Sequence, residues 1–367
     1  SSHESKFVRM ITEEVCARFH RSPLHVADYP VGLDSRLRKL MSLLTVKTDD
    51  GVRMVGIHGI GGIGKSTVAR AVYNSISDQF EGSCFLAHVR ESSAKHGLVH
   101  LQEMVLSEIL GHRHINLRSA EQGTSLMRHR LSRRKVLLVL DDVDRKEQLE
   151  ALAGGFDWFG FGSRVMITTR DMGLLALHGI ECSYRVEELS DKEARELLTS
   201  HAFEAGKVDP RYTEVLNRAV TYCSGLPLAL EVLGSQLYGE SLYEWDAAIS
   251  RYKRIPQRDI IEILRVSYDY LEDDQKDIFL DIACFFNGQK LADIEYILWA
   301  CYGFSTKFII IVLIDKSLIN IDDGRVMLHD LIQDMGREIV RKESREPGKR
   351  SRLWYVNDVV RVLEENK

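Results

Sequence analysis

The sequence predicts an α/β domain with a parallel sheet flanked by helices, followed by a helical domain and a winged-helix domain. Three observations support this order. Short apolar runs alternate with helical patterns over residues 31–189, helical patterns alone fill residues 190–256, and two strand-like runs flank an Asp-Gly turn within residues 257–367. Apolar runs separated by helices are typical of parallel strands buried on both faces. Residues 1–30 are expected to form a helix over 6–18 and then a proline-marked linker.

Five apolar runs supply the expected strands of the sheet, at residues 54–57, 84–87, 136–140, 165–167 and 184–186. In the second region Ser190 is suited to cap a helix, and further helices are expected over 212–222, 228–238 and 243–252. In the third region, strands at 317–320 and 326–328 flank an Asp-Asp-Gly turn. The run 308–314 is β-branched, which favours a strand by propensity, and we leave its structure open.

Composition and charge argue against some classes of function. The 367 residues carry 49 Lys and Arg against 54 Asp and Glu, a formal charge of −5, which disfavours polyanion binding by the chain as a whole. The longest apolar run, 308–314, is far shorter than the ~20 residues of a membrane-spanning helix, so no membrane contact is expected. Six scattered cysteines without a CxxC pair fit a reducing compartment, and we expect the cytoplasm and also the nucleus. Both ends look like cuts from a longer protein.

A phosphate-binding loop follows the first expected strand and precedes a helical stretch at 67–77. Its pattern is GxxxxGK followed by Ser, and this context between strand and helix is the one that the motif requires. Glycines let backbone N–H groups approach phosphate oxygens, and the helix N-terminus adds partial positive charge. The fold class is therefore a P-loop NTPase. The expected nucleotide-binding residues here are Gly59, Gly61, Gly62, Ile63, Gly64, Lys65, Ser66 and Thr67, with Lys65 on the β- and γ-phosphates and Ser66 on Mg²⁺.

Two further strands end in polar residues, at the edge where open α/β sheets bind ligands. The run 136–140 is followed by Asp141 and Asp142. Asp141 is expected to hold Mg²⁺ through water, and Asp142 stands where many ATPases have a water-polarising carboxylate, although its side chain is short. Arg170 follows the run 165–167 and either senses the γ-phosphate or pairs with Asp171 as an ordinary surface arginine.

These motifs, taken together, resemble the NB-ARC region of plant nucleotide-binding, leucine-rich-repeat immune receptors. The resemblance also covers FEGSCFL at 80–86, GSR at 162–164, GLPLAL at 225–230, FLDIACFF at 279–286 and HDLIQDMGRE at 329–338. Asp144 stands where coiled-coil-type receptors usually have Trp, which indicates the TIR-type subclass. The TIR and leucine-rich-repeat domains are not within these residues, so no TIR NADase activity is expected from this chain.

The resemblance implies a set of nucleotide contacts and partners. Val31 and Gly32 resemble the backbone contact to adenine, Pro227 the residue that packs on the base, and His329 the MHD-motif histidine that reaches the β-phosphate of ADP, with Leu328 in place of Met. We expect Asp330 to cap the helix over 331–340 and so to fix where His329 points. The implied ligands are ADP in the resting state, ATP and Mg²⁺. The implied partners are the receptor's own TIR and leucine-rich-repeat domains, with a monomer in the ADP state and a homo-oligomer on activation.

Three functions compete at this point. The first is a switch that acts through its bound nucleotide and hydrolyses ATP slowly at most. The second is an ATPase that turns over continuously. The third is a DNA-binding ATPase that uses its winged helix, where Glu338, Glu343 and Glu346 interleave with the basic residues and make nucleic acid an unfavoured partner. Those basic residues are Arg337, Arg341, Lys342, Arg345, Lys349, Arg350 and Arg352.

Overall fold

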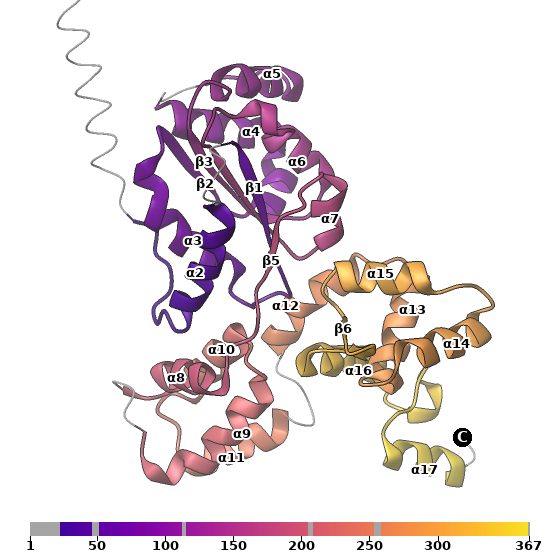
Figure 1. The fold of residues 1–367 in the computed structure, drawn as a ribbon. Helices are drawn as coiled ribbons and strands as arrows, with labels where there is room; N and C mark the ends of the chain where they lie inside the picture. Colours follow the sequence, from indigo (N-terminus) through magenta and orange to yellow (C-terminus); the bar gives the residue numbers. More distant parts are fainter. Residues whose placement is uncertain (1–22, 46–50, 112–114, 205–207, 253–257, 366–367) are drawn as a thin grey trace, which may run out of the picture. The chain divides into compact units, whose positions relative to one another are not determined.

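The computed structural model describes residues 23–45, 51–111, 115–204, 208–252 and 258–365 (Figure 1). The helix expected over 6–18 and the expected boundary at Ile255-Pro256, after the helical domain, lie outside them. Contacts divide the chain into two compact units. The first unit extends to Val186 without Gly59–Gly64, and the second contains Gly59–Gly64 and Glu187–Lys367. This division is coarser than the four segments expected from the sequence, whose boundaries stay predictions.

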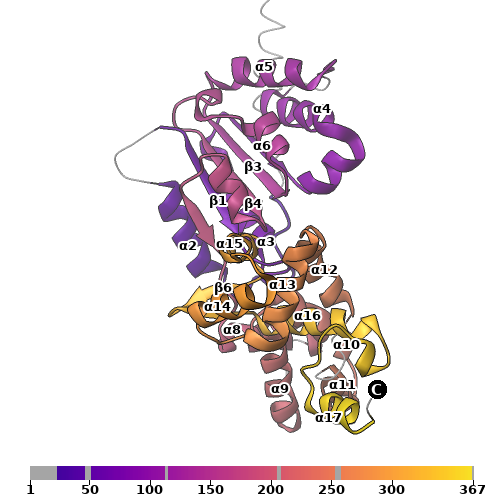
Figure 2. The ribbon, with the colours of Figure 1, turned by 90° about the vertical axis from the view of Figure 1, so that its right-hand side faces the viewer.

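The first unit is built on a five-stranded parallel sheet, as predicted, in the order β2-β3-β4-β1-β5 (Figure 1). Nearly all residues of the three central strands β3, β4 and β1 are buried, because the sheet has helices on both sides (Figure 2). The strands are β1 (Arg53–His58), β2 (Gly82–Leu86), β3 (Val136–Val143), β4 (Arg164–Thr169) and β5 (Ser183–Arg185). The helices are α2 (Leu33–Leu44), α3 (Lys65–Ile76), α4 (Val89–Leu110), α5 (Ala120–Leu131), α6 (Lys146–Ala153) and α7 (Met172–Leu177), with 3-10 turns η1 (Ser77–Gln79) and η2 (Phe156–Trp158).

The helical part of the second unit begins with a capping box. The Ser190 hydroxyl accepts from the Glu193 amide while the Glu193 carboxylate accepts from the Ser190 amide, which satisfies two free donors at the start of α8. The predicted cap at Ser190 is thereby confirmed. The elements are α8 (Asp191–Ala202), η4 (Pro210–Tyr212), α9 (Thr213–Cys223), α10 (Pro227–Leu237) and α11 (Leu242–Tyr252).

The winged-helix part contains a hairpin whose first strand begins at Asn320, later than the expected 317–320, and a helix where the sequence left the structure open. Asp323 and Gly324 both have positive φ, 45° and 70°, as a two-residue turn between antiparallel strands requires. The run 308–314 lies in helix α15, because burial of Ile309, Ile310 and Leu313 on one helical face overrides β propensity. The elements are α12 (Arg258–Asp269), α13 (Asp273–Asp281), the π-helical η5 (Ile282–Phe286), α14 (Leu291–Tyr302), α15 (Lys307–Asp315), β6 (Asn320–Asp322), β7 (Arg325–Met327), α16 (Asp330–Glu343), η6 (Pro347–Lys349) and α17 (Val356–Glu365).

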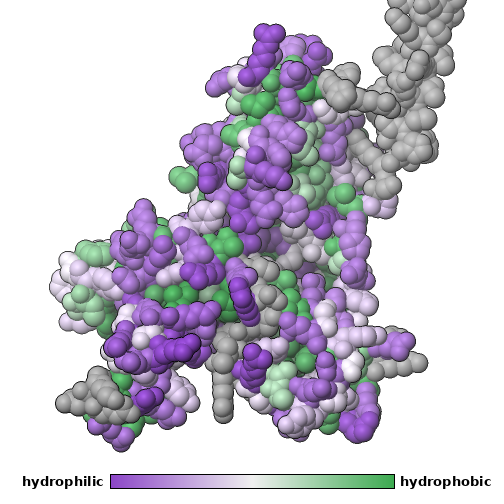
Figure 3. Space-filling view, turned by 180° about the vertical axis from the view of Figure 1, so that it is seen from behind, coloured by the Kyte–Doolittle hydropathy of each residue, from purple (hydrophilic) through white to green (hydrophobic). Residues whose placement is uncertain are grey.

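The face seen from behind is mainly hydrophilic, with hydrophobic side chains in small groups (Figure 3). No single described helix is long and apolar enough to cross a membrane, and α14 with α15 reaches the required length only as a pair bent by 119°. The five cysteines in the described part of the chain are all free thiols.

A tight turn joins α9 to α10. Ser224 and Gly225 both have positive φ, 46° and 73°, and Pro227 is the first residue of α10, where its missing N–H is not needed. The Gly225 carbonyl accepts from the Leu189 amide at 2.9 Å. A Cβ on Gly225 would lie 2.5 Å from the Leu189 carbonyl oxygen, so no other residue fits without backbone movement.

We predict that Gly225→Ala destabilises the chain more than Gly239→Ala. Both glycines have positive φ, 73° and 77°, so both substitutions carry a left-handed penalty of about 1 kcal/mol or more. Only Gly225→Ala adds a backbone clash, which should cost roughly a further 1–3 kcal/mol. Chemical unfolding followed by circular dichroism measures both midpoints. Equal midpoints would show that the turn adapts to the extra carbon.

Candidate nucleotide-binding site

The carboxyl ends of β3 and β4 meet the first turn of α3 at Asp141. Its Oδ1 accepts from the Ser66 hydroxyl at 2.7 Å and from the Thr168 hydroxyl at 2.7 Å, and the side chain is buried. Parallel pairing of β3 with β4 places Thr168 beside the end of β3, and the phosphate loop leads directly into α3. The structure therefore brings together the two residues, Ser66 and Asp141, that the sequence predicts for Mg²⁺.

These two side chains fit a magnesium ion. Both offer oxygen, which Mg²⁺ prefers, and Mg²⁺ in nucleotide sites takes only one or two protein oxygens beside water and phosphate. Within the described ranges, no cluster of three or more His, Cys, Asp and Glu is arranged to hold a metal by itself. Ser66 and Asp141 would hold the ion, which would neutralise phosphate charge once nucleotide is bound.

The side chains of Asp142 and Asp141 have different partners because the backbone is irregular between Leu140 and Val143. Asp142 has φ of 59°, and the β3–β4 register shifts between Leu140 and Val143. Its amide donates to the Thr168 hydroxyl at 2.8 Å, so Thr168 donates to one aspartate and accepts from the next. The Asp142 carboxylate accepts from Arg90 Nε at 2.8 Å and lies 3.8 Å from Arg170 Nε. Its predicted role toward water stays a prediction.

Arg170 is an inward-facing residue at the end of β4. Its side chain is 19% exposed and forms its ion pair with Asp142. Asp171 instead caps α7, where its carboxylate accepts from the Leu174 amide at 3.3 Å. Arg170 is thus mostly buried and not an ordinary surface arginine, and its predicted sensing of the γ-phosphate stays a prediction.

Lys65 is buried among these charges. Burial, and next the guanidinium of Arg170, lower the pKa of Lys65 to about 7, while Asp142 and Asp141 oppose the shift and Arg90 adds to it. Two guanidinium groups and two carboxylates surround the ammonium group, so burial is the main cause of its lowered pKa. A phosphate group bound here would add negative charge and favour protonated Lys65.

The loop Gly59–Gly64 groups with the second unit by its contacts. Gly59, Gly62 and Gly64 have positive φ of 146°, 78° and 95°. The Gly62 carbonyl accepts from the Leu228 amide at 3.2 Å, and a Cβ on Gly62 would lie 2.6 Å from Leu228 Cβ. Gly62 is thus required both by its backbone conformation and by its contact with α10.

The chain before the predicted adenine-side segment is bonded to α3, the helix that follows the phosphate loop. Gly32 has φ of 68° and precedes α2, and its carbonyl accepts from Arg36 Nη1 at 2.7 Å. Before Val31 the chain is held by Asn74 of α3, whose side chain pairs with the Leu24 amide and carbonyl at 2.9 and 2.8 Å. The contact of Val31 and Gly32 with adenine stays a prediction.

His329 and Asp330 both contact Ser224 in the turn before α10. His329 Nε2 donates to the Ser224 carbonyl at 3.1 Å, and Nδ1 accepts from the Leu331 amide at 3.2 Å. Burial lowers the pKa of His329, in agreement with this neutral tautomer. The Asp330 carboxylate accepts from the Ser224 hydroxyl at 2.7 Å.

The prediction that Asp330 caps α16 is wrong. His329 is the N-cap residue and its ring nitrogen takes the cap hydrogen bond, which leaves Asp330 as the first residue of the helix. The Asp330 side chain instead ties α16 to the end of α9. Two predicted contacts stay predictions: that of His329 with the β-phosphate and that of Pro227 with the base.

Sequence reasoning missed two residues of the site, Arg90 and His58. Arg90, in the first turn of α4, pairs with Asp142 across 52 residues, and in the sequence it looks like one charge of a solvated helix. His58 ends β1, and burial, with Arg185 and Lys65 next, lowers its pKa to about 4, so it is neutral at pH 7. A polar residue that ends an apolar run just before the phosphate loop was the one available hint for His58.

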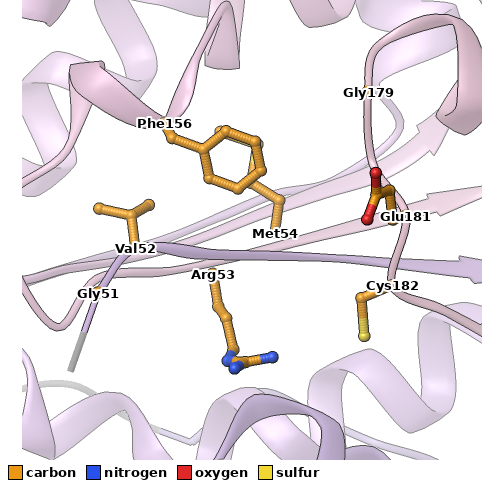
Figure 4. A pocket seen from close by; sticks show the side chains of 8 residues that line it. All are labelled: Gly51, Val52, Arg53, Met54, Phe156, Gly179, Glu181 and Cys182. Atoms are coloured by element: carbon orange, nitrogen blue, oxygen red, sulfur yellow. The ribbon is translucent and has the colours of Figure 1, made fainter. Parts of the chain in front are cut away.

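A cavity of about 370 Å³ lies at the other end of β1, away from these residues. Figure 4 shows the ring of Phe156 beside Met54, whereas Arg53 points to the opposite side of the strand. Ligands of open α/β sheets bind at the carboxyl ends of strands, and this cavity is at the amino end. It is therefore not the predicted nucleotide site.

Comparisons with known proteins agree with this geometry. Residues 33–207 match the NB-ARC domain family, and residues 272–344 match the winged-helix domain of Roq1-like disease resistance proteins. A Walker-type ATPase of Pyrococcus abyssi has a similar fold, with a TM-score of 0.57 at 17% identity over 87% of this chain and 99% of that one. Fold and site define a P-loop nucleotide-binding protein of the NB-ARC class.

Sequence relatives identify the family to which the chain belongs. TMV resistance protein N of Nicotiana glutinosa is 41% identical over 98% of this chain and 31% of its own length. Disease resistance protein RUN1 of Vitis rotundifolia is 40% identical over 100% of this chain and 27% of its own length. The chain belongs to the plant TIR-type nucleotide-binding, leucine-rich-repeat resistance proteins and corresponds to their NB-ARC and winged-helix region. It spans less than a third of the length of these two relatives.

We predict that nucleotide affinity falls as pH rises above 7. The free Lys65, with a pKa of about 7, is largely neutral at pH 8–9, and phosphate binds its protonated form, so binding takes up a proton. The dissociation constant for ADP should rise about fivefold from pH 7 to pH 8 and then nearly tenfold per unit. Calorimetry in buffers of different ionisation enthalpy measures both the affinity and the proton uptake.

Lys65→Arg is the matched control, because arginine stays protonated across this range. Its affinity should be lower than that of the wild type and independent of pH from 7 to 9. A wild-type affinity that does not change with pH would contradict a lowered pKa at Lys65.

Proposed function

We propose that the chain is an ADP/ATP-dependent molecular switch, closed with ADP and released by exchange for ATP. In the resistance protein it would be a monomer with ADP, restrained by contacts with TIR and leucine-rich-repeat domains, and a homo-oligomer after activation in the cytoplasm or nucleus. ATP hydrolysis would be slow and would reset the switch.

One observation favours the function of a switch over that of a simple nucleotide-binding domain. Within the second unit, hydrogen bonds connect the phosphate loop to the winged-helix motif. Gly62 is bonded to Leu228 at the start of α10. Four residues earlier, Ser224 is bonded by both His329 and Asp330 at the start of α16. A change at the loop that shifts α10 would therefore alter the bonds of Ser224, and the reverse also holds.

Such a path favours ADP over ATP only if the two nucleotides interact differently with the closed state. The γ-phosphate adds negative charge on the side of Lys65, Arg170 and Asp142, where the existing ion pair would have to rearrange. ADP leaves that pair intact. We therefore assign the closed state to ADP.

No observation favours the DNA-binding alternative. Most of the basic residues that suggested it are paired with carboxylates of the same domain. These pairs are Arg341 and Lys342 with Glu338, Lys349 with Glu346, Arg350 with Asp358, and Arg352 with Asp277 and Asp281. Their charge is therefore already balanced within the protein.

We predict that the purified chain carries ADP in near-stoichiometric amount and that Lys65→Arg lowers this amount. The guanidinium keeps the charge but cannot reproduce the compact ammonium in the buried position of Lys65. Denaturation followed by ion-exchange chromatography identifies and counts the released nucleotide.

Two results would contradict the switch. One is equal nucleotide loading of Lys65→Arg and wild type, which would show that Lys65 does not bind the nucleotide. The other is sustained ATP turnover by the monomer at the ~1–100 s⁻¹ that is typical of phosphoryl-transfer enzymes. That rate would identify a continuously working ATPase.

We predict that Asp330→Val speeds ADP release about two- to tenfold, because it removes an exposed hydrogen bond worth roughly 0.5–1.5 kcal/mol. Ser224→Ala removes the same bond from the other side and should have a similar effect. Stopped-flow release of a fluorescent ADP analogue measures the rates.

The double variant provides the control. If the two side chains act through one bond, Ser224→Ala with Asp330→Val should release ADP no faster than the faster single variant. Multiplied effects would mean that each residue acts elsewhere, and unchanged rates in folded protein would mean that the contact packs the domain without holding nucleotide.

A further inference from the structure

Arg90 is placed over the end of β3 by strand register. β2 pairs with β3 so that Leu86, the last residue of β2, lies beside Leu140. The chain then turns through His88, which has φ of 53°, and enters α4 at the fully buried Val89. The first turn of α4 consequently lies next to the residues that follow Leu140, among them Asp142.

A buried glutamine fixes the backbone of this turn. Ser93 donates its hydroxyl to the Arg90 carbonyl at 3.0 Å, and Gln148 Nε2 donates to that hydroxyl at 2.8 Å. The same amide nitrogen donates to Asp144 Oδ1 at 2.8 Å, and Gln148 Oε1 accepts from the Asp144 amide at 3.0 Å. The turn that carries Arg90 is thus fastened to the loop after β3, and its guanidinium is held at the site.

The cations at this end of the sheet outnumber the anions. Lys65, Arg90 and Arg170 stand against Asp141 and Asp142, and both hydrogen bonds described for Asp141 come from hydroxyl groups. Asp142 therefore serves both arginines, at 2.8 Å from Arg90 Nε and 3.8 Å from Arg170 Nε. Such a group of cations is suited to receive one further anion.

We propose that Arg90 discriminates ATP from ADP: it pairs with Asp142 when no γ-phosphate is present and moves to the γ-phosphate when ATP binds. This inference rests on the proposed function, because it needs the nucleotide at Lys65. The γ-phosphate carries more negative charge than a carboxylate and offers more acceptor oxygens, so it competes successfully for a guanidinium. Asp142 then acts as the partner that holds Arg90 in the ADP state.

The position of Lys65 explains why Arg90 would respond to the γ-phosphate and not to the α- or β-phosphate. A phosphate-loop lysine contacts the β- and γ-phosphates, and Arg90 and Arg170 are close enough to influence the charge on Lys65. The α-phosphate and β-phosphate also bind the loop amides, so they need no arginine. With ADP bound, Arg90 stays paired with Asp142, and only ATP offers it a second anionic partner, the γ-phosphate.

The test compares dissociation constants for ADP and for β,γ-imido-ATP, both with Mg²⁺, in variants of the whole chain. Arg90→Gln should weaken β,γ-imido-ATP about ten- to hundredfold while ADP binding stays within a factor of about two. Arg90→Lys keeps the charge without the planar fork and should lose less. Asp142→Asn weakens the competing partner and should shift the ratio in the opposite direction, toward β,γ-imido-ATP.

An equal loss of both nucleotides in Arg90→Gln would overturn the inference, because it would show that Arg90 only supports the fold. An unchanged ratio in both Arg90→Gln and Asp142→Asn would also overturn it. Failure of the proposed function is separate, since the wild type would then bind neither nucleotide. Circular dichroism and the retained ADP affinity confirm that each variant is folded.

Discussion

The second unit depends on the hydrogen bonds that Ser224 makes in its left-handed conformation. With φ of 46°, Ser224 turns its carbonyl to His329 and its hydroxyl to Asp330, and Gly225 then closes the turn against Leu189. Pro227 starts α10 directly after this turn, and the next amide, of Leu228, reaches the phosphate loop. A winged-helix motif and a phosphate loop are in this way joined through five consecutive residues.

The first unit depends on a balance of charge at the ends of β3 and β4. Thr168 separates the two aspartates by donating to Asp141 and accepting from Asp142, so that one carboxylate faces Ser66 and the other faces the arginines. Burial, and next the guanidinium of Arg170, lowers the pKa of Lys65, and a bound anion would favour its protonated form. In the proposed mechanism, nucleotide binding and nucleotide discrimination would use different carboxylates of one short segment.

The fold class and the position of the phosphate-loop motif could be predicted from the sequence. Periodicity and glycine spacing locate the strands and the phosphate loop, because those features arise from neighbouring residues. Arg90 could not be predicted, since only the β2–β3 register brings it to Asp142. The sequence favoured Asp330 as the cap of α16 because carboxylates are common caps. In the structure the imidazole of His329 caps the helix, and the Asp330 carboxylate accepts a hydrogen bond from Ser224, 106 residues away in the chain.

The central claim is that the phosphate loop and the winged-helix motif respond together to the nucleotide. Hydrogen–deuterium exchange tests it most directly at two amides, Leu228, which donates to Gly62, and Leu331, which donates to His329. With ADP, both amides should exchange slowly, and replacement of ADP by β,γ-imido-ATP should accelerate both by a similar factor. If the exchange at Leu228 changes while Leu331 stays protected to the same degree with either nucleotide, the two motifs are not coupled and the account is wrong.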